Sequence, residues 1–384
     1  MNDVSRAKDG FKAPELPPCR KPSDGGGAEA KLLTPFTLRG VTLRHRIVMS
    51  PMCQYSAEDG FVNDWHFVHL GSRAAGGASL VMVEATAVTA QGRITPGDTG
   101  IWSDAHVEPL ARIARFIESQ GVVPGIQLAH AGRKASCEVP WRGGKRLSLA
   151  EGGWPVVAPS ALPFNPGDPV SIPLDRKGIE EVVAAFEAAA RRALQAGFKE
   201  IELHAAHGYL LQEFLSPLAN KRDDDYGGSL ENRMRLPLRV AKSLRAIVPP
   251  ELLLYMRISA TDWVEGGWDI EQSVELAKRA KALGVDLIDV SSGALVPDAK
   301  IPVGPGFQVP FAKRIRAEAG IATGAVGMIT DPHQAERIIA DGDADIVLLA
   351  RELLREPYWA LKAETALGGQ ACWPTQYGYA VARK

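Results

Sequence analysis

The feature that most constrains the fold is an alternation that runs along the whole chain. A short apolar run, a polar or glycine-containing loop and an amphipathic stretch recur about eight times in 384 residues, without a literal sequence repeat. Continuous apolar runs predict strands buried on both faces, and the amphipathic stretches between them predict helices that cover those faces. The predicted strands span residues 46–52, 80–85, 123–129, 200–204, 252–258, 287–291, 322–326 and 346–350.

About eight such units favour a closed (β/α)₈ TIM barrel, with an open doubly wound sheet as the alternative. No G-x-G-x-x-G sequence follows the first strand, which weighs against the open sheet. A small hairpin is predicted around Gly40, ahead of the barrel. Residues 1–30, rich in Pro, Gly and charge, are expected to form a flexible tail. We expect residues 31–384 to form a single barrel domain with a C-terminal extension.

Composition narrows the classes of partner. The net charge is −1, and no apolar run approaches the ~20 residues of a membrane span, so we expect neither a nucleic-acid nor a membrane partner. The four cysteines are far apart and form no C-x-x-C pair. They give no sign of a disulfide framework, a zinc site or an iron–sulfur cluster, and a cytoplasmic location is expected.

Small and cationic residues follow the last two predicted strands. Gly327 would let the backbone approach a ligand closely, and Arg351 follows Ala350 at the start of a helical stretch. Barrel phosphate sites lie after these strands, where free N–H groups at helix starts favour anions. We expect a phosphate cradle here, the alternative being that Arg351 pairs with a surface carboxylate.

Other strand ends carry amide and cationic donors, namely Gln127, Lys134 and Arg257. Arg257 follows the apolar run "LLLYM", so its charge is expected to be partly buried and to need a partner. A structural salt bridge and a delocalised anion above the barrel both remain open. Cys53, after the first strand, is either a small core residue or part of the same site.

The stretch "HAAHGY" places His204, His207 and Tyr209 within six residues at the end of a strand. All three side chains would leave one strand end toward one pocket. An H-x-x-H pair can bind zinc, but zinc needs a third protein ligand and no further His/Cys cluster accompanies this pair. A buried tyrosine with a paired hydroxyl is the structural alternative for Tyr209. A second pair, His66 and His69, lies in a helical pattern and is expected to serve packing and surface roles.

Taken together, these segments resemble the old yellow enzyme family of FMN-dependent ene-reductases, most closely its thermophilic-like and xenobiotic-reductase branch. The resemblance spans residues 32 to about 379 and rests on "HRIVMSPMCQYSAEDG", "IQLAHAGRKAS", "ELHAAHGYLLQEFLSPLANKRDDDYGGSLENRMRLPLRV", "MRISATDW" and "VGMIT" with "LLARELLREP". It implies an FMN cofactor, NADPH or NADH as hydride donor, and a small enone or nitro compound as acceptor.

The resemblance also implies roles for individual residues. His204 and His207 would donate hydrogen bonds to the acceptor's oxygen, hydride would pass from flavin N5 to the β-carbon, and Tyr209 would protonate the α-carbon. The two half-reactions would alternate in one pocket, in a ping-pong sequence. Tyr55 and Lys134 would belong to the substrate pocket. The flavin would be held by Ser50, Pro51, Met52, Cys53, Ala85, Gln127, Arg257, Gly327, Ala350 and Arg351.

The C-terminus departs from the family pattern. Related enzymes often place an arginine after a Gln-Tyr pair, and it reaches into a neighbouring subunit's active site. Here the stretch reads "CWPTQYGYAVARK", with Tyr379 at that place and Trp373 and Arg383 nearby. A homodimer or homotetramer is expected, with the C-terminus near a neighbouring active site.

Three other functions compete with this interpretation. A larger flavin dehydrogenase would join the barrel to an iron–sulfur cluster and a second nucleotide domain, and the scattered cysteines argue against it. A flavin- or ligand-binding protein without turnover is opposed only by the His204, His207 and Tyr209 trio. A metal-dependent barrel hydrolase is the last alternative, and metal analysis would discriminate it.

Overall fold

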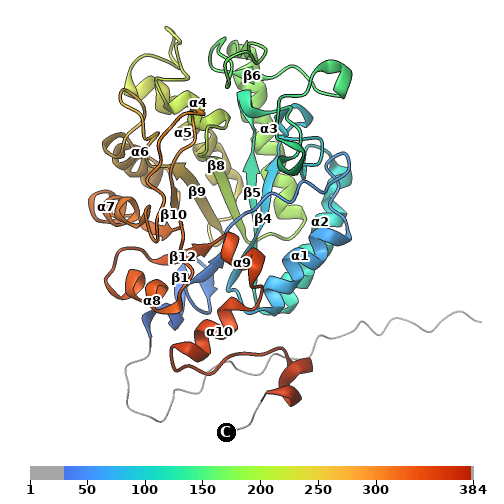
Figure 1. Cartoon of the computed structure of the whole chain (residues 1–384), viewed down its shortest axis with the longest axis vertical. Coiled ribbons are helices and arrows are strands. Elements are labelled where there is room, and N and C mark those ends of the chain that lie inside the picture. Colours follow the sequence, from blue (N-terminus) through green and yellow to red (C-terminus); the bar gives the residue numbers. More distant parts are fainter. Residues whose placement is uncertain (1–29, 382–384) are drawn as a thin grey trace, which may run out of the picture.

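A computed structural model describes residues 30–381, and its centre is a closed barrel of eight parallel strands (Figure 1). The strands follow one another around the barrel in chain order, so each new strand adds beside the last one. The predicted TIM barrel is confirmed, and every predicted strand is present within three residues of its expected ends. The barrel strands are β3 (Ile47–Met49), β4 (Leu80–Ala87), β5 (Val123–Ala129), β8 (Glu200–Ala205), β9 (Leu253–Ser259), β10 (Leu287–Ser291), β11 (Ala322–Ala325) and β12 (Ile346–Leu349).

Helices cover the outside of the barrel, because their apolar faces need the apolar outer face of the sheet. Several begin at a side-chain cap, as in α6, where Asp269 accepts from the Gln272 N–H at 2.9 Å. The helices are α1 (Asp64–Ala75), α2 (Val107–Ser119), α3 (Arg176–Gln195), α4 (Leu210–Leu215), α5 (Leu230–Ile247), α6 (Ile270–Ala282), α7 (Val309–Ala319), α8 (Pro332–Ala340), α9 (Arg351–Arg355) and α10 (Trp359–Ala366).

The predicted hairpin around Gly40 is present as β1 (Phe36–Leu38) and β2 (Val41–Leu43). Phe36 and Val41 pack against an apolar cluster that fills the bottom of the barrel and includes Val48 and Tyr255. The hairpin therefore closes the amino-terminal end of the barrel. The opposite end, where α4 and β6 (Val157–Ala158) lie in Figure 1, stays available for function.

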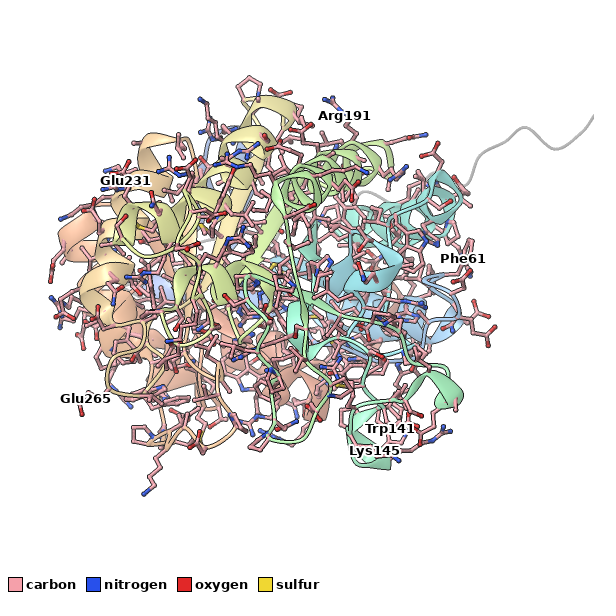
Figure 2. The ribbon with its side chains drawn as sticks, turned by 90° about the horizontal axis from the view of Figure 1, so that it is seen from above. Phe61, Trp141, Lys145, Arg191, Glu231 and Glu265 are labelled. Carbon is pink, nitrogen blue, oxygen red and sulfur yellow. The ribbon has the colours of Figure 1, made fainter. Side chains whose placement is uncertain are left out.

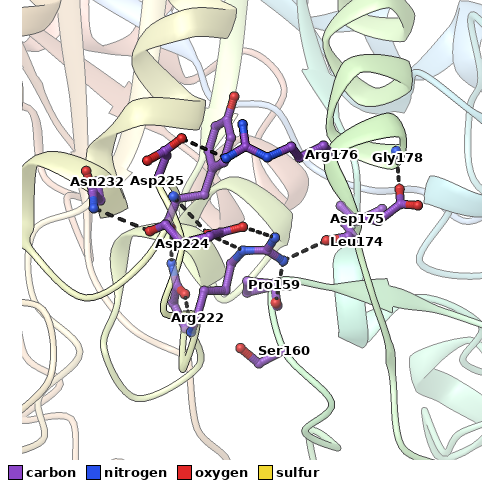
Figure 3. A network of polar contacts seen from close by, with 12 residues as sticks. Pro159, Ser160, Leu174, Asp175, Arg176, Gly178, Arg222, Asp224, Asp225 and Asn232 are labelled. Carbon is purple, nitrogen blue, oxygen red and sulfur yellow. Dashed lines mark hydrogen bonds and ion pairs between the residues drawn. The ribbon is translucent and has the colours of Figure 1, made fainter.

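A long excursion, residues 130–175, joins β5 to α3 over this open end, and Figure 2 places its Trp141 and Lys145 at the edge of the molecule. Arg222 fixes the excursion by donating to the carbonyls of Pro159 at 2.9 Å and Leu174 at 2.6 Å (Figure 3). Arg222 also donates to both carboxylate oxygens of Asp224, from Nε to Oδ1 at 3.0 Å and from Nη2 to Oδ2 at 2.6 Å. A bidentate pair of this kind fixes geometry as well as charge, so the excursion is tied to the loop that follows α4.

The expected N-terminal tail lies almost wholly outside the described residues. Among the cysteines within residues 30–381, Cys53 and Cys137 are free thiols, whereas Cys372 is disulfide-bonded. The spacing of the cysteines did not predict this bond, because pairing depends on proximity in space and not along the chain. No helix in the described part of the chain combines the length and the apolar character needed to cross a bilayer.

Candidate active site

The site is centred on a strained turn at the end of β8. His207 and Gly208 both have positive φ, 61° and 72°, which L side chains rarely adopt. The turn is held by the His207 N–H, which donates to Ser259 Oγ at 2.9 Å, and by the Gly208 N–H, which donates to Gln212 Oε1 at 2.5 Å. Strain of this kind persists only where surrounding contacts fix it, and it is common at functional sites.

This turn brings the three predicted catalytic side chains together. The His204 ring lies 5.1 Å from the His207 ring and 5.0 Å from the Tyr209 ring, centroid to centroid, with both pairs nearly perpendicular. His204 Nδ1 accepts from the Ala206 N–H at 3.2 Å, so the proton of the neutral ring resides on Nε2. His207 Nε2 lies 2.7 Å from Ser291 Oγ, which leaves Nδ1 as its second polar atom.

Burial sets the protonation of the trio. Desolvation, and then the positive charge of Arg257, lowers the pKa of His204 and of His207 well below 6.5. Desolvation raises the pKa of Tyr209 well above 10, with nearby Cys53 adding to the effect. At neutral pH the site therefore offers two uncharged imidazoles that can donate hydrogen bonds and one phenol that keeps its proton.

Lys134 closes one side of this group. Its ammonium donates to the backbone carbonyls of His207 at 2.8 Å and Ala294 at 3.2 Å, and it lies 5.1 Å from the Tyr209 ring centroid. Burial lowers the pKa of Lys134 to about 8, against the raising effect of Glu213. The charge of Lys134 is therefore sensitive to mildly alkaline pH.

The segment after β3 forms the facing wall. Ser50 is fully buried, and Pro51, Met52 and Cys53 follow it in partly exposed positions. Burial, then the charges of Glu84 and Asp98, raises the pKa of the Cys53 thiol. Tyr55, held at φ 50°, packs edge-on against Trp141 of the excursion with ring centroids 6.0 Å apart.

Inside the barrel, below this level, Arg257 has two partners. Its Nη2 donates to Ser50 Oγ at 2.9 Å, and its Nε lies 3.2 Å from Asp289 Oδ2. The structural salt bridge considered for this arginine is therefore present. Nη2 of the same guanidinium nevertheless reaches Ser50 on the wall of the candidate site, so the paired cation also borders that site.

Gln127 and Ala85 complete the floor. Gln127 is buried on β5 and donates through Nε2 to Glu202 Oε2 at 2.6 Å. Ala85 lies at a break in the pairing register between β4 and β5, and it lines a narrow cleft together with Asp98 and Tyr209. A bulge of this kind redirects side chains at a strand end.

The predicted phosphate residues stand at the ends of β11 and β12. Gly327 has φ +118°, and a Cβ built on it would lie 2.7 Å from Gln308 Nε2, so the position requires glycine. Ala350 precedes α9, which starts at the exposed Arg351. Within residues 30–381, no ion pair of Arg351 is present. A bare backbone beside an uncommitted cation fits the phosphate of FMN.

One predicted residue is not part of this group. Tyr379 is 92% exposed, and its segment, η7 (Thr375–Ala380), lies in Figure 1 at the end of the molecule opposite α4 and β6. Exposed aromatic side chains at such a place cannot serve the site of their own chain. No group of three or more His, Cys, Asp or Glu side chains in residues 30–381 is arranged to hold a metal ion.

Sequence reasoning missed several polar residues that support the site. Glu84 lies inside an apolar run, and Asp98 lies in a loop, where burial raises its pKa to about 7. His66, expected to serve packing and surface roles, is buried and lies 3.2 Å from Glu84 Oε1. The only indication in the sequence was the charge of Glu84 within an otherwise apolar strand, which calls for a buried partner.

Comparisons with known proteins identify the family of this chain. The sequence profile of the NADH:flavin oxidoreductase / NADH oxidase family matches residues 31–370. The chain is 50% identical over 351 residues to an NADPH dehydrogenase of Geobacillus sp. (strain WCH70), covering 91% of this chain and 98% of that protein. It is 48% identical over 353 residues to an NADPH dehydrogenase of Halalkalibacterium halodurans, covering 91% and 98%.

Solved structures show the same barrel. The old yellow enzyme homologue from Zymomonas mobilis superposes with a TM-score of 0.72 at 26% identity, covering 90% of this chain and 96% of that one. Morphinone reductase gives a TM-score of 0.72 at 27% identity, covering 90% and 91%. A 2-naphthoyl-CoA reductase gives 0.79 at 28% identity, and this chain spans about half of it, 88% against 52%.

Proposed function

This chain belongs to the NADH:flavin oxidoreductase / NADH oxidase family, and from that premise we propose that it reduces the activated C=C bond of α,β-unsaturated carbonyl or nitro compounds. It is an FMN-dependent oxidoreductase of the old yellow enzyme type, with NADPH or NADH as electron donor. The observation that carries the finer proposal is the convergence of His204, His207 and Tyr209 on one turn.

FMN, when bound, would supply the hydride chemistry that connects NAD(P)H to the acceptor. We propose that the wall residues Ser50, Pro51, Met52 and Cys53 line the ring, together with the floor residues Ala85 and Gln127. Arg257, oriented by Asp289, would face the edge of the ring that becomes negative. Gly327, Ala350 and Arg351 would hold the phosphate.

The protein's own residues would activate the acceptor. Neutral His204 and His207 would donate hydrogen bonds to its carbonyl or nitro oxygen, and preorganised donors stabilise the charge that develops there. Tyr209, which keeps its proton, would deliver that proton to the α-carbon as general acid. Tyr55 and Lys134 would border the pocket, which donor and acceptor would occupy in turn.

The remaining expectations belong to the same proposal. Residues 31–384 would act as one cytoplasmic barrel domain with a C-terminal extension. That extension carries the exposed Tyr377 and Tyr379, at 44% and 92% exposure. Aromatic residues are enriched at protein interfaces, so we propose a homodimer or homotetramer in which Tyr379 approaches a neighbouring active site.

An anaerobic visible spectrum tests the function directly. The purified protein should show a flavin spectrum that bleaches with NADPH and returns when cyclohexenone is added. Bleaching without return would refute the enone proposal and leave the cofactor assignment standing. A colourless protein that FMN cannot reconstitute would contradict the assignment of the phosphate residues.

A further inference from the structure

Glu84 is a buried carboxylate directly beneath the loop that carries Cys53 and Tyr55. Its side chain is 3% exposed and points from the register break in β4 toward that loop. Oε2 accepts from the backbone N–H of Gln54 at 2.6 Å, and Oε1 accepts from Thr99 Oγ1 at 3.1 Å. Gln54 lies between Cys53 and Tyr55, so one carboxylate oxygen fixes the backbone between two residues of the candidate site.

His66 supports this carboxylate from the other side. Its Nδ1 lies 3.1 Å from the Asn63 backbone nitrogen and 3.0 Å from Asn63 Oδ1, so the start of α1 holds the ring in place. Nε2 lies 3.2 Å from Glu84 Oε1, an electrostatic contact and not a well-aligned hydrogen bond. His69, one turn further along α1, is also buried, but it makes no ion pair with Glu84 among the described residues.

The loop needs such support because its conformation is unfavourable by itself. Tyr55 has φ 50°, and a side chain in the left-handed region costs about 1–2 kcal/mol. The Ala57 N–H donates to the Gly97 carbonyl at 2.8 Å, and a Cβ on Gly97 would lie 2.5 Å from the Tyr55 carbonyl oxygen. The loop is thus held at both of its ends by groups that pack below it.

We propose that Glu84 is a positioning residue: its carboxylate, oriented by Thr99 and His66, fixes the Cys53–Tyr55 loop in the geometry that the pocket requires. The inference rests on the proposed function for the meaning of that pocket. The negative charge has a second effect, because after burial it is the largest contribution that raises the pKa of the Cys53 thiol.

Two substitutions distinguish the effect of the position of the Glu84 carboxylate oxygen from the effect of its charge. Glu84→Gln keeps an oxygen within reach of the Gln54 N–H and loses the charge. Glu84→Asp keeps the charge and withdraws the oxygen by one methylene. His66→Gln removes the supporting contact, and His69→Gln is its matched control on the same helix.

The first measurement is the rate of Cys53 alkylation by iodoacetamide at pH 8, with Cys137 as internal reference, in the holoenzyme and in the full chain stripped of FMN. Glu84→Gln should raise this rate about tenfold, because the rate follows the thiolate fraction and a neighbouring charge shifts a pKa by about one unit. His69→Gln should change it less than about twofold. This reaction needs neither NADPH nor an acceptor.

The second measurement is the steady-state KM and kcat of each variant with cyclohexenone. Glu84→Asp should raise the KM about tenfold, because Tyr55 moves with the loop. The KM of Glu84→Gln and of His69→Gln should stay near the wild-type value. The KM of His66→Gln should fall between these two results. Wild-type rates and KM in both Glu84 variants would overturn the positioning role. If the wild-type enzyme does not turn over cyclohexenone but the Cys53 alkylation rates of wild type and Glu84→Gln still differ, only the proposed function is overturned.

Discussion

Tyr209 is the residue whose chemistry can be isolated most cleanly, because its ring contacts both His204 and Lys134 while its hydroxyl is the atom proposed to react. Tyr209→Phe should slow reoxidation by an enone about a hundredfold or more, the usual contribution of general acid catalysis. The reductive half-reaction with NADPH should change little. Stopped-flow measurement of the two half-reactions checks this, and equal loss in both would contradict the acid role.

His204 should govern ligand affinity. In His204→Ala the Nε2–H donor is lost, and a hydrogen bond to a charged group contributes about 1.5–3 kcal/mol. The dissociation constant of a phenol, followed by the change in the flavin spectrum, should therefore rise about ten- to hundredfold. The variant His69→Gln, on a helix outside the barrel, serves as the control. Unchanged phenol affinity in His204→Ala would contradict the role of His204 as a hydrogen-bond donor to the ligand.

At the scale of elements, the turn between β8 and α4 decides whether the three side chains meet. Gly208 has φ +72°, and a Cβ there would lie 2.6 Å from the Ala294 carbonyl oxygen. Gly228 has nearly the same φ, +73°, with nothing within 4 Å of its Cβ position. The two glycines therefore separate backbone strain from steric conflict.

Gly228→Ala should lower the free energy of unfolding by about 1–2 kcal/mol, the left-handed backbone penalty alone. Gly208→Ala should lower it by more and should also reduce enone turnover at least tenfold, because the collision displaces Tyr209. Denaturant unfolding and steady-state rates of the pair test this. Equal losses of stability in the two variants, with turnover retained, would show that the Gly208 contact is unimportant.

At the scale of the whole molecule, buried histidines couple stability to pH. Burial lowers the pKa of His130 from 6.5 to about 4. A histidine with a lowered folded-state pKa contributes stability that is fully present above pH 6.5 and is lost as the pH falls toward 4, because only the unfolded state then takes up the proton. The shift corresponds to about 3 kcal/mol.

His130→Gln should therefore make the free energy of unfolding depend less on pH in the acid range. Between pH 7 and pH 4 the variant should lose about 3 kcal/mol less of its free energy of unfolding than the wild type. Its stability at pH 7 can be lower, because His130 Nδ1 accepts from the Gly132 N–H at 3.1 Å. Urea unfolding at each pH measures the difference, and parallel curves would refute it.

The sequence by itself determined the order of strands and helices and the residues at the strand ends. Continuous apolar runs and 3.6-residue periodicity are local properties, so they can be read without knowing what packs where. The "HAAHGY" turn likewise keeps its three side chains together through adjacency along the chain. The hairpin at Gly40 was also predictable, since its turn and its alternation lie within a few residues.

The tertiary structure alone decided the supporting partners. Glu84 contacts Gln54, Arg257 contacts Asp289, and Tyr55 contacts Trp141. The partners in each pair lie far apart along the chain, so the periodicity of the sequence does not predict these contacts. Barrel closure sets strand register, and register decides which buried polar atoms come within hydrogen-bond distance of one another. The place of Tyr379 followed from the path of the C-terminal segment, and the Cys372 bond from proximity in space; neither is encoded in local pattern.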